Sequence, residues 1–316
     1  MTGVDVTGRV TAIVVAWRTR DLVDQCLRSL AASAPSVPAI VVDNGSADGT
    51  AEMVRRDWPG VRLIANEVNV GYTRANNQGM ELASTEHLLL LNADSMMTPG
   101  CLEALLHRMD ADPRAGIVAP RLEYGNGRWQ RWTAGAAPSV LSSAAYFLFF
   151  ERLLPRRLGQ RSVYLQRDVR QAFQPDWVCA AGVLVRRSAM ADIGGFDERI
   201  FAYMDDVDLC RRARQAGWNV WYEPAAQGVH LMGQSSLGEP GGVSPLALTS
   251  YNRYVAAHCG GAAALAVRVC EVVGFATRAA VYAGRAALTR RETWHGRKAR
   301  AHLTHLKLSF ERSPLP

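Results

Sequence analysis

The chain has 316 residues, of which 48% are hydrophobic and 21% charged, and it carries a formal net charge of +7. This composition is ordinary for a globular protein and excludes a low-complexity chain, while the length allows one large domain with a smaller addition. The basic balance suits an anionic partner, such as a membrane surface, a phosphorylated small molecule or a nucleic acid.

Apolar runs that are typical of buried strands alternate with segments of helical spacing over the first 124 residues. The predicted strands are 11–17, 39–43, 61–67, 87–94 and 115–124. The predicted helices are 21–33, 50–58, 71–83 and 99–109. This alternation predicts an α/β fold, with a mixed, mostly parallel sheet that has helices on its flanks.

The alternation is lost over 125–176 and returns with a strand and helix in 178–190, a helix over 205–217 and the segment 220–230. Beyond Pro245 the chain is rich in Ala, Val and Arg, which predicts basic amphipathic helices. We therefore expect a catalytic domain over 1–240 and a basic helical extension over 241–316.

The six cysteines are scattered and include no CxxC pair, which predicts buried thiols in a reducing compartment. The first residues lack the pattern of a signal peptide. The longest apolar run, 140–150, is shorter than the ~20 residues that span a bilayer. These features predict a cytoplasmic protein.

No glycine-rich loop follows the first strand, so a Rossmann dinucleotide site is excluded, and no P-loop occurs. In such sheets ligands bind at the carboxyl ends of strands, where the chain places Trp17, Asp43, Asn92 and Asp94. Asp43 suits either a nucleotide contact or an Asx turn. Asp94 suits either a divalent cation or the cap of the next helix. His230 is either a ligand that favours Mn²⁺ or a structural histidine.

Three carboxylates, Asp205, Asp206 and Asp208, begin the predicted helix 205–217. The helix dipole favours negative charge at this end, and Asp208 is placed to pair with Arg211 or Arg212. Since capping needs only one carboxylate, another acid of the cluster can serve as a base for an incoming hydroxyl.

Five ordered segments within about 9–236 together resemble the inverting family 2 glycosyltransferases, which have the GT-A fold. The branch that the chain resembles is the bacterial rhamnosyltransferase-like one. The segments are AIVVAW, VVDNGSADGT, NVGYTRANNQG, LLLLNADSMMTPGCL and the run from CAAGVLVRR to EPAAQGVH.

The resemblance implies a role for each matching residue. Asp43 would contact the nucleobase, Asp94 and His230 would hold Mn²⁺ or Mg²⁺, and Asp206 would be the general base. The other implied substrate contacts are Trp17, Tyr72, Arg74, Asn76, Asn77, Asn92, Trp177 and Asp205, with Trp177 toward the acceptor. Asn92 stands where the family's DxD motif begins, and Asp205 replaces the Glu of its ED pair.

The expected reaction is transfer of a sugar, rhamnose from dTDP-rhamnose, to a hydroxyl acceptor. The basic C-terminal helices suit an anionic membrane surface, which indicates a polyprenyl-diphosphate-linked acceptor and attachment to the inner face of the plasma membrane. Core closure or a homodimer interface would also account for these helices. The alternatives are a soluble acceptor or a non-catalytic sugar-nucleotide-binding protein. No nucleic-acid-binding motif accompanies the positive charge.

Overall fold

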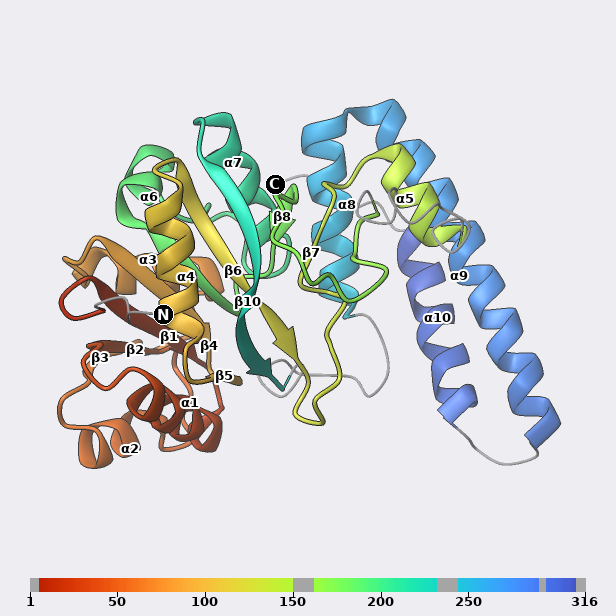
Figure 1. Ribbon diagram of the computed structural model, residues 1–316. Helices are drawn as coiled ribbons and strands as arrows, with labels where there is room; N and C mark the ends of the chain where they lie inside the picture. Colours follow the sequence, from red (N-terminus) through yellow and green to blue (C-terminus); the bar gives the residue numbers. More distant parts are fainter. Residues whose placement is uncertain (1–5, 150–161, 232–243, 290–293, 311–316) are drawn as a thin grey trace. The chain divides into compact units, whose positions relative to one another are not determined.

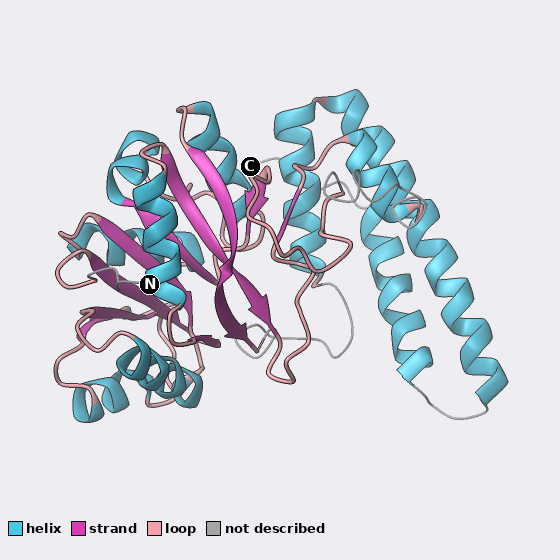
Figure 2. Cartoon of the chain, viewed as in Figure 1, coloured by secondary structure: helices cyan, strands magenta, loops and turns pink. Residues whose placement is uncertain are grey.

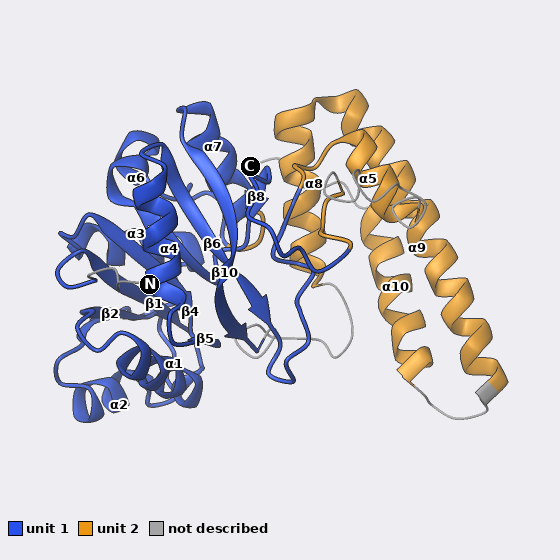
Figure 3. Cartoon of the chain, in the orientation of Figure 1, with its two compact units in different colours: residues 1–135, 167–201, 205–236 blue, residues 136–166, 202–204, 237–316 orange. Residues whose placement is uncertain are grey.

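The computed structural model describes residues 6–149, 162–231, 244–289 and 294–310, and the chain forms two compact units (Figure 3). The first unit comprises Met1–Gly135, Arg167–Phe201 and Asp205–Ser236. The second comprises Ala136–Gln166, Ala202–Met204 and Leu237–Pro316. The second unit thus takes in two segments besides the C-terminal helices, and the functional division at residue 240 stays a prediction.

An eight-stranded sheet lies at the centre of the first unit, in the order β3-β2-β1-β4-β9-β6-β10-β5 (Figure 1). Its strands are β1 (Val10–Ala16), β2 (Ala39–Asp43), β3 (Arg62–Ala65), β4 (His87–Asn92), β5 (Ser95–Met97), β6 (Ala115–Glu123), β9 (Gly182–Arg186) and β10 (Asn219–His230). Four neighbouring pairs are parallel, whereas β9 runs antiparallel to β4 and β6, and β5 antiparallel to β10. The predicted mixed, mostly parallel sheet is confirmed.

Helices cover both faces of this sheet (Figure 2). They are α1 (Arg20–Ser33), α2 (Thr50–Asp57), α3 (Tyr72–Leu82), α4 (Cys101–Ala111), α6 (Arg187–Ile193) and α7 (Asp205–Gln215). Apolar residues of α1, α2 and α4 join one core cluster with alternate residues of β1, such as Val10 and Val14. On the other face of β1, Ile13 packs so closely on α3 that a Cβ at Gly79 would lie 2.5 Å from its side chain. Burial on both faces explains why β1 is apolar at nearly every position.

Two features of the strands were not predicted. The strand predicted over 87–94 ends at Asn92, and the short strand β5 follows it. A separate pair, β7 (Ala134–Gly135) and β8 (Trp177–Val178), lies in the stretch that showed no strand–helix rhythm and at its end. Strands of two or three residues are too short to show a period in the sequence.

The regular elements of the second unit, among its described residues, are helices. Its helices are α5 (Val140–Phe147), α8 (Pro245–Cys259), α9 (Gly261–Thr289) and α10 (Trp294–Phe310). A capping box between Ser139 and Ser142 begins α5. Phe147 and Phe275 belong to one apolar cluster that joins α5, α8 and α9. Among the described helices, none has the length and apolar character needed to cross a bilayer.

Candidate active site

The carboxyl ends of β1, β2 and β4 meet at one edge of the sheet. Ala16 lies opposite Asp43, and Val15 lies opposite Asn92, so the polar residues after these strands are neighbours. The buried carboxylate of Asp43 accepts a hydrogen bond from the Ser46 backbone N–H at 3.1 Å. This bond steadies the turn after β2 from three residues on, one residue further than in an Asx turn, and contact with a nucleobase stays a prediction.

Asn92 binds a tyrosine in this structure. The Tyr72 hydroxyl lies 2.9 Å from Asn92 Oδ1 and 3.4 Å from the carbonyl oxygen of Ala180. The Tyr72 ring packs edge-on against Phe196, with 6.1 Å between the ring centroids. The side-chain oxygen of Asn92 thus anchors Tyr72 at the edge of the sheet.

Asp94 and His230 lie side by side because β5 pairs with β10. The register places Ser95 opposite His230, and the backbone N–H of Leu231 donates to the Asp94 carbonyl at 2.9 Å. As a result, His230 Nε2 lies 3.3 Å from Asp94 Oδ1. Asp94 does not cap the next helix, because α4 begins at Cys101 with Gly100 as its N-cap residue.

Gln130 holds the other side of the His230 ring. Its Nε2 donates to the backbone carbonyls of His230 and Glu123, the latter at 3.2 Å, and its Oε1 lies 3.2 Å from His230 Nδ1. Because the amide nitrogen is used on two carbonyls, Oε1 must accept, and we assign the neutral ring's hydrogen to Nδ1. The lone pair on Nε2 then faces Asp94, the arrangement that is usual for a metal-binding histidine.

These donors fit a divalent cation. Two ligands about 2.1 Å from one ion, on neighbouring octahedral positions, are roughly 3 Å apart, close to the 3.3 Å between His230 Nε2 and Asp94 Oδ1. Asp94 is only 1% exposed, and a buried carboxylate favours a nearby cation. The described residues contain no group of three or more His, Cys, Asp or Glu suited to a metal, so a diphosphate and water would have to complete the coordination.

Asp206 lies in the first turn of α7, where its Oδ1 accepts from the Val207 backbone N–H at 2.8 Å. The side chain is half-buried. Burial, and then the negative charge of Asp205, raise the pKa of Asp206 to about 8. A raised pKa near neutrality is characteristic of general acids and bases.

The third acid of this cluster has a structural partner. Asp208 pairs with Arg212, one helical turn away, at 2.6 Å. Arg212 also donates to the carbonyl oxygens of Ile193 and Gly195 at 2.8 and 2.7 Å. The predicted Asp208–Arg212 pair is confirmed, and it ties α7 to the end of α6.

Cys179 directly follows β8, in the segment that meets the end of β4. The Asn92 backbone N–H donates to the Ala181 carbonyl at 3.2 Å, next to the Ala180 carbonyl that the Tyr72 hydroxyl contacts. Burial raises the pKa of Cys179, and the negative charges of Asp206, Asp205 and Asp94 raise it further. That the Asp94–His230 pair and Asp206 belong to one site stays a prediction.

Two residues of the GYTRANN segment hold the loop that precedes α7. Asn77 Oδ1 accepts from the Phe196 N–H at 2.9 Å, while Asn77 Nδ2 donates to Phe196 O at 3.0 Å and Glu198 at 3.1 Å. Arg74 pairs with Glu198 at 3.4 Å from the exposed side of α3. Asn76 turns back to the carbonyl oxygen of Tyr72. Their proposed contacts with the donor stay predictions.

Two tryptophans complete the predicted set. Trp17 is half-buried after β1, with the Arg18 guanidinium 5.1 Å from its ring centroid. Trp177 lies in β8 and is only 4% exposed, so an acceptor contact by its side chain stays a prediction.

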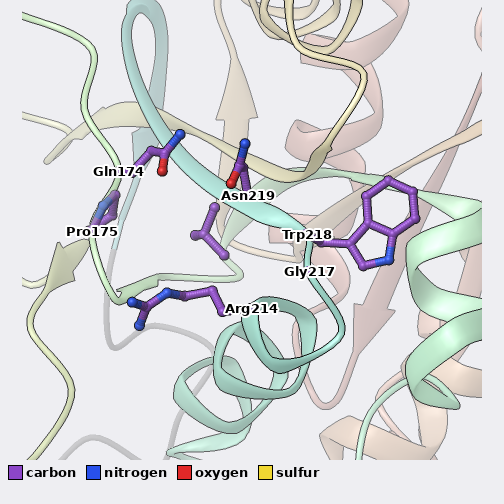
Figure 4. Close-up of a pocket in the computed structure, with 7 residues that line it drawn as sticks. Gln174, Pro175, Arg214, Gly217, Trp218 and Asn219 are labelled. Carbon is purple, nitrogen blue, oxygen red and sulfur yellow. The ribbon is translucent and has the colours of Figure 1, made fainter.

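A separate hollow of about 270 Å³ lies at the start of β10, at the opposite end of that strand from His230. Gln174, Pro175, Arg214 and Asn219 surround it, while the Trp218 ring turns away (Figure 4) and donates to Asp192 at 3.0 Å. Arg214 is paired with Asp176 at 2.5 Å. None of the predicted site residues lines this hollow.

Residues 11–175 match the family model described as Glycosyl transferase family 2. The chain belongs to glycosyltransferase family 2. One relative of this family 2 enzyme is the N-acetylglucosaminyl-diphospho-decaprenol L-rhamnosyltransferase of Mycobacterium tuberculosis, 33% identical over 67% of this chain and 72% of the relative. Another is the pre-mycofactocin glycosyltransferase of the same species, 31% identical over 65% of this chain and 39% of the relative. The predicted family and glycosyltransferase activity are confirmed.

Solved structures agree on the GT-A fold of this family 2 enzyme. A mannosyltransferase from Pyrobaculum calidifontis, in complex with GDP-Man and Mn²⁺, covers 95% of this chain and 85% of its own, with a TM-score of 0.57 and 16% identity. GalNAc-T7 with UDP, GalNAc and Mn²⁺ has a TM-score of 0.58 at 15% identity, covering 78% of this chain. This chain spans about half, 48%, of the GalNAc-T7 chain.

Sequence reasoning missed Gln130 as the partner of His230. Gln130 lies in the irregular stretch 125–176, far from any motif. The contacts of Gln130 span 100 positions along the chain, so no local pattern marks it.

Proposed function

We propose that this family 2 enzyme transfers L-rhamnose, with dTDP-rhamnose as the expected donor, to a hydroxyl of a polyprenyl-diphosphate-linked saccharide, inverting the anomeric carbon. The observation that carries the proposal is the Asp94–His230 pair, in which His230 Nε2 lies 3.3 Å from Asp94 Oδ1. The choice of sugar and acceptor is supported by the relative whose name specifies an L-rhamnosyltransferase acting on a decaprenol diphosphate.

On the donor side of the site, the Asp94–His230 pair is the proposed cation site. These two residues would hold Mn²⁺ or Mg²⁺, while Gln130 keeps His230 Nε2 directed toward Asp94. When bound there, the ion acts as a Lewis acid for the diphosphate oxygens, which gain negative charge as the sugar departs. Asp43 and Trp17, at the same edge of the sheet, are the proposed contacts for the nucleoside.

On the acceptor side of the site, Asp206 is the proposed base. The acceptor oxygen attacks the anomeric carbon from the face opposite the diphosphate, and the bond from that carbon to the diphosphate oxygen breaks. The hydroxyl proton passes to the Asp206 carboxylate. The raised pKa of Asp206, caused by burial and by Asp205, makes it a stronger base than an ordinary aspartate.

The test incubates the purified chain with Mn²⁺, a short polyprenyl-diphospho-N-acetylglucosamine and a panel of dTDP-, UDP- and GDP-sugars. We expect a mass increase of one deoxyhexose from dTDP-rhamnose alone and an inverted anomeric configuration by NMR. Transfer from another donor would contradict the sugar assignment, and retention would contradict the mechanism. Donor binding without transfer or hydrolysis would indicate a non-catalytic sugar-nucleotide-binding protein.

A further inference from the structure

The exposed face of α10 combines cations with large apolar side chains. Five exposed residues that recur every three or four positions lie on one side of the helix, and we call them the basic-apolar face of α10. They are Arg297, Arg300, Leu303, Lys307 and Phe310. Leu303 and Phe310 are 48% and 69% exposed, and water is an unfavourable environment for side chains of this size.

The described parts of α9 and α10 carry little negative charge. Within 261–289 and 294–310, the described parts of the α9–α10 pair, the sole acid is Glu271, and it is fully buried. The two helices pack against each other within the second unit (Figure 1). On α9, Leu265, Val269 and Val273 are also exposed, one helical turn apart. The pair thus presents positive charge and apolar surface together.

The mixture of cationic and apolar side chains on this face indicates which kind of partner it binds. A second copy of the chain, docked through the same face, would set Arg297, Arg300 and Lys307 against like charges, which is repulsive. A nucleic acid would satisfy the cations but not Leu303 or the α9 aliphatic residues. An anionic bilayer offers phosphates at its surface and hydrocarbon a few ångströms deeper, so it can satisfy both kinds of side chain.

We propose that the basic-apolar face of α10 docks this enzyme on an anionic phospholipid membrane. Leu303 and Phe310 enter the boundary between headgroups and acyl chains, where the apolar side chains of such helices insert. Arg297, Arg300 and Lys307 meet the lipid phosphates. The inference rests on the proposed function in that a polyprenyl-linked acceptor is presented at such a surface.

The experiment is co-sedimentation of the full chain with vesicles of phosphatidylglycerol and phosphatidylcholine in equal parts, and with vesicles of phosphatidylcholine alone, at low salt. The samples contain neither donor nor acceptor, so the result does not depend on the proposed reaction. We expect binding to the anionic vesicles, weakened as salt shortens the Debye length from about 10 Å at 0.1 M to about 3 Å at 1 M.

Substitutions test whether vesicle binding depends on the basic-apolar face of α10. Replacing Arg297, Arg300 and Lys307 by Gln should lower the partition coefficient by about a hundredfold, since each such cation contributes roughly fivefold. Leu303→Gln with Phe310→Gln should also lower it. The matched control replaces Arg55, Arg62 and Arg114, three exposed arginines of the first unit, and should bind almost as the unaltered chain does. Circular dichroism checks that each variant is folded.

Several outcomes would overturn the proposal. These are absence of binding to anionic vesicles at low salt, equal losses in the face variant and the control, and preference for duplex DNA over vesicles. A change of oligomeric state in the face variant, with vesicle binding unaltered, would show that a second copy occupies the face. Rhamnose transfer to a soluble acceptor analogue is measured separately, so failure of docking and failure of the reaction are distinguishable.

Discussion

Asp206 is placed to take a proton, and its replacement tests that role. We expect Asp206→Asn to reduce kcat by about 10²–10⁴, the usual contribution of a general base, while the Kd of the donor stays within a small factor, because the donor is held by other residues. Single-turnover kinetics and donor calorimetry measure the two quantities. An unaltered kcat would show that another group accepts the proton.

The raised pKa of Asp206 predicts a pH profile. The base must be ionised, and the pKa of Asp206 is raised to about 8 by burial and by Asp205. We therefore expect kcat/KM of the free enzyme to rise about tenfold per pH unit up to roughly pH 8 and then to level off. Asp205→Asn removes the neighbouring negative charge and should move the rising part of the kcat/KM profile to lower pH. A profile that is flat from pH 6 to 9 would contradict the assignment.

Gln130 positions His230, so its loss should weaken metal binding. Gln130→Met removes the acceptor on His230 Nδ1, and substitutions of this kind typically cost 10–100-fold in metal affinity. Calorimetry with Mn²⁺ measures this loss, and nitrogen NMR of the metal-free protein should show the His230 ring losing its preference for the Nδ1–H form. Gln78→Met is the control, because Gln78 bonds Asn66 instead. Unchanged Mn²⁺ affinity would rule out the positioning role.

At the scale of elements, Asn77 joins α3 to the loop before α7. Asn77→Ala leaves the N–H and carbonyl of Phe196 without their side-chain partner, and we expect a loss of about 1–3 kcal/mol in the free energy of unfolding. Arg74→Gln should cost under about 1 kcal/mol, because the Arg74–Glu198 pair is exposed. Urea denaturation compares the two. A larger KM for the donor in Arg74→Gln alone would support a substrate contact.

The elements differ in how far the sequence predicts them. Dense apolar runs such as TAIVVAW and HLLLLN mark β1 and β4, because these strands are buried on both faces. The direction of β9 and the existence of β5 depend on pairing with strands distant in sequence, such as Ser95 with His230. The motifs named Asp94, His230 and Asp206 as candidates, but only this pairing shows how Asp94 reaches His230, and only the fold places Gln130 beside it.

At the scale of the whole molecule, a buried carboxyl makes the second unit sensitive to pH. Glu271 is fully buried and accepts from Asn252 at 3.1 Å. Burial raises its pKa from the ordinary value of 4.5 to about 7. Below pH 4.5 its stabilising contribution is complete, and as pH rises through about 7 that contribution is lost, because the folded unit must then ionise a buried acid.

Glu271→Gln should remove this dependence. We expect the variant to unfold at a higher temperature than the unaltered chain at pH 8, and the two to differ less at pH 5. Thermal unfolding followed by circular dichroism at both pH values measures the difference. Glu52→Gln, on the exposed surface of α2, is the control and should have no such effect. A variant less stable at pH 8 would mean that ionised Glu271 is favourable.

The second unit is assembled from three separate stretches of chain, one of which is only Ala202–Met204, immediately before Asp205. Grafting the C-terminal helices alone from one such enzyme onto another would therefore leave part of the second unit behind. A chimera joined at a single crossover near residue 240 would combine Ala136–Gln166 and Ala202–Met204 from one parent with helices from the other. Productive hybrids should need all three stretches to be exchanged together.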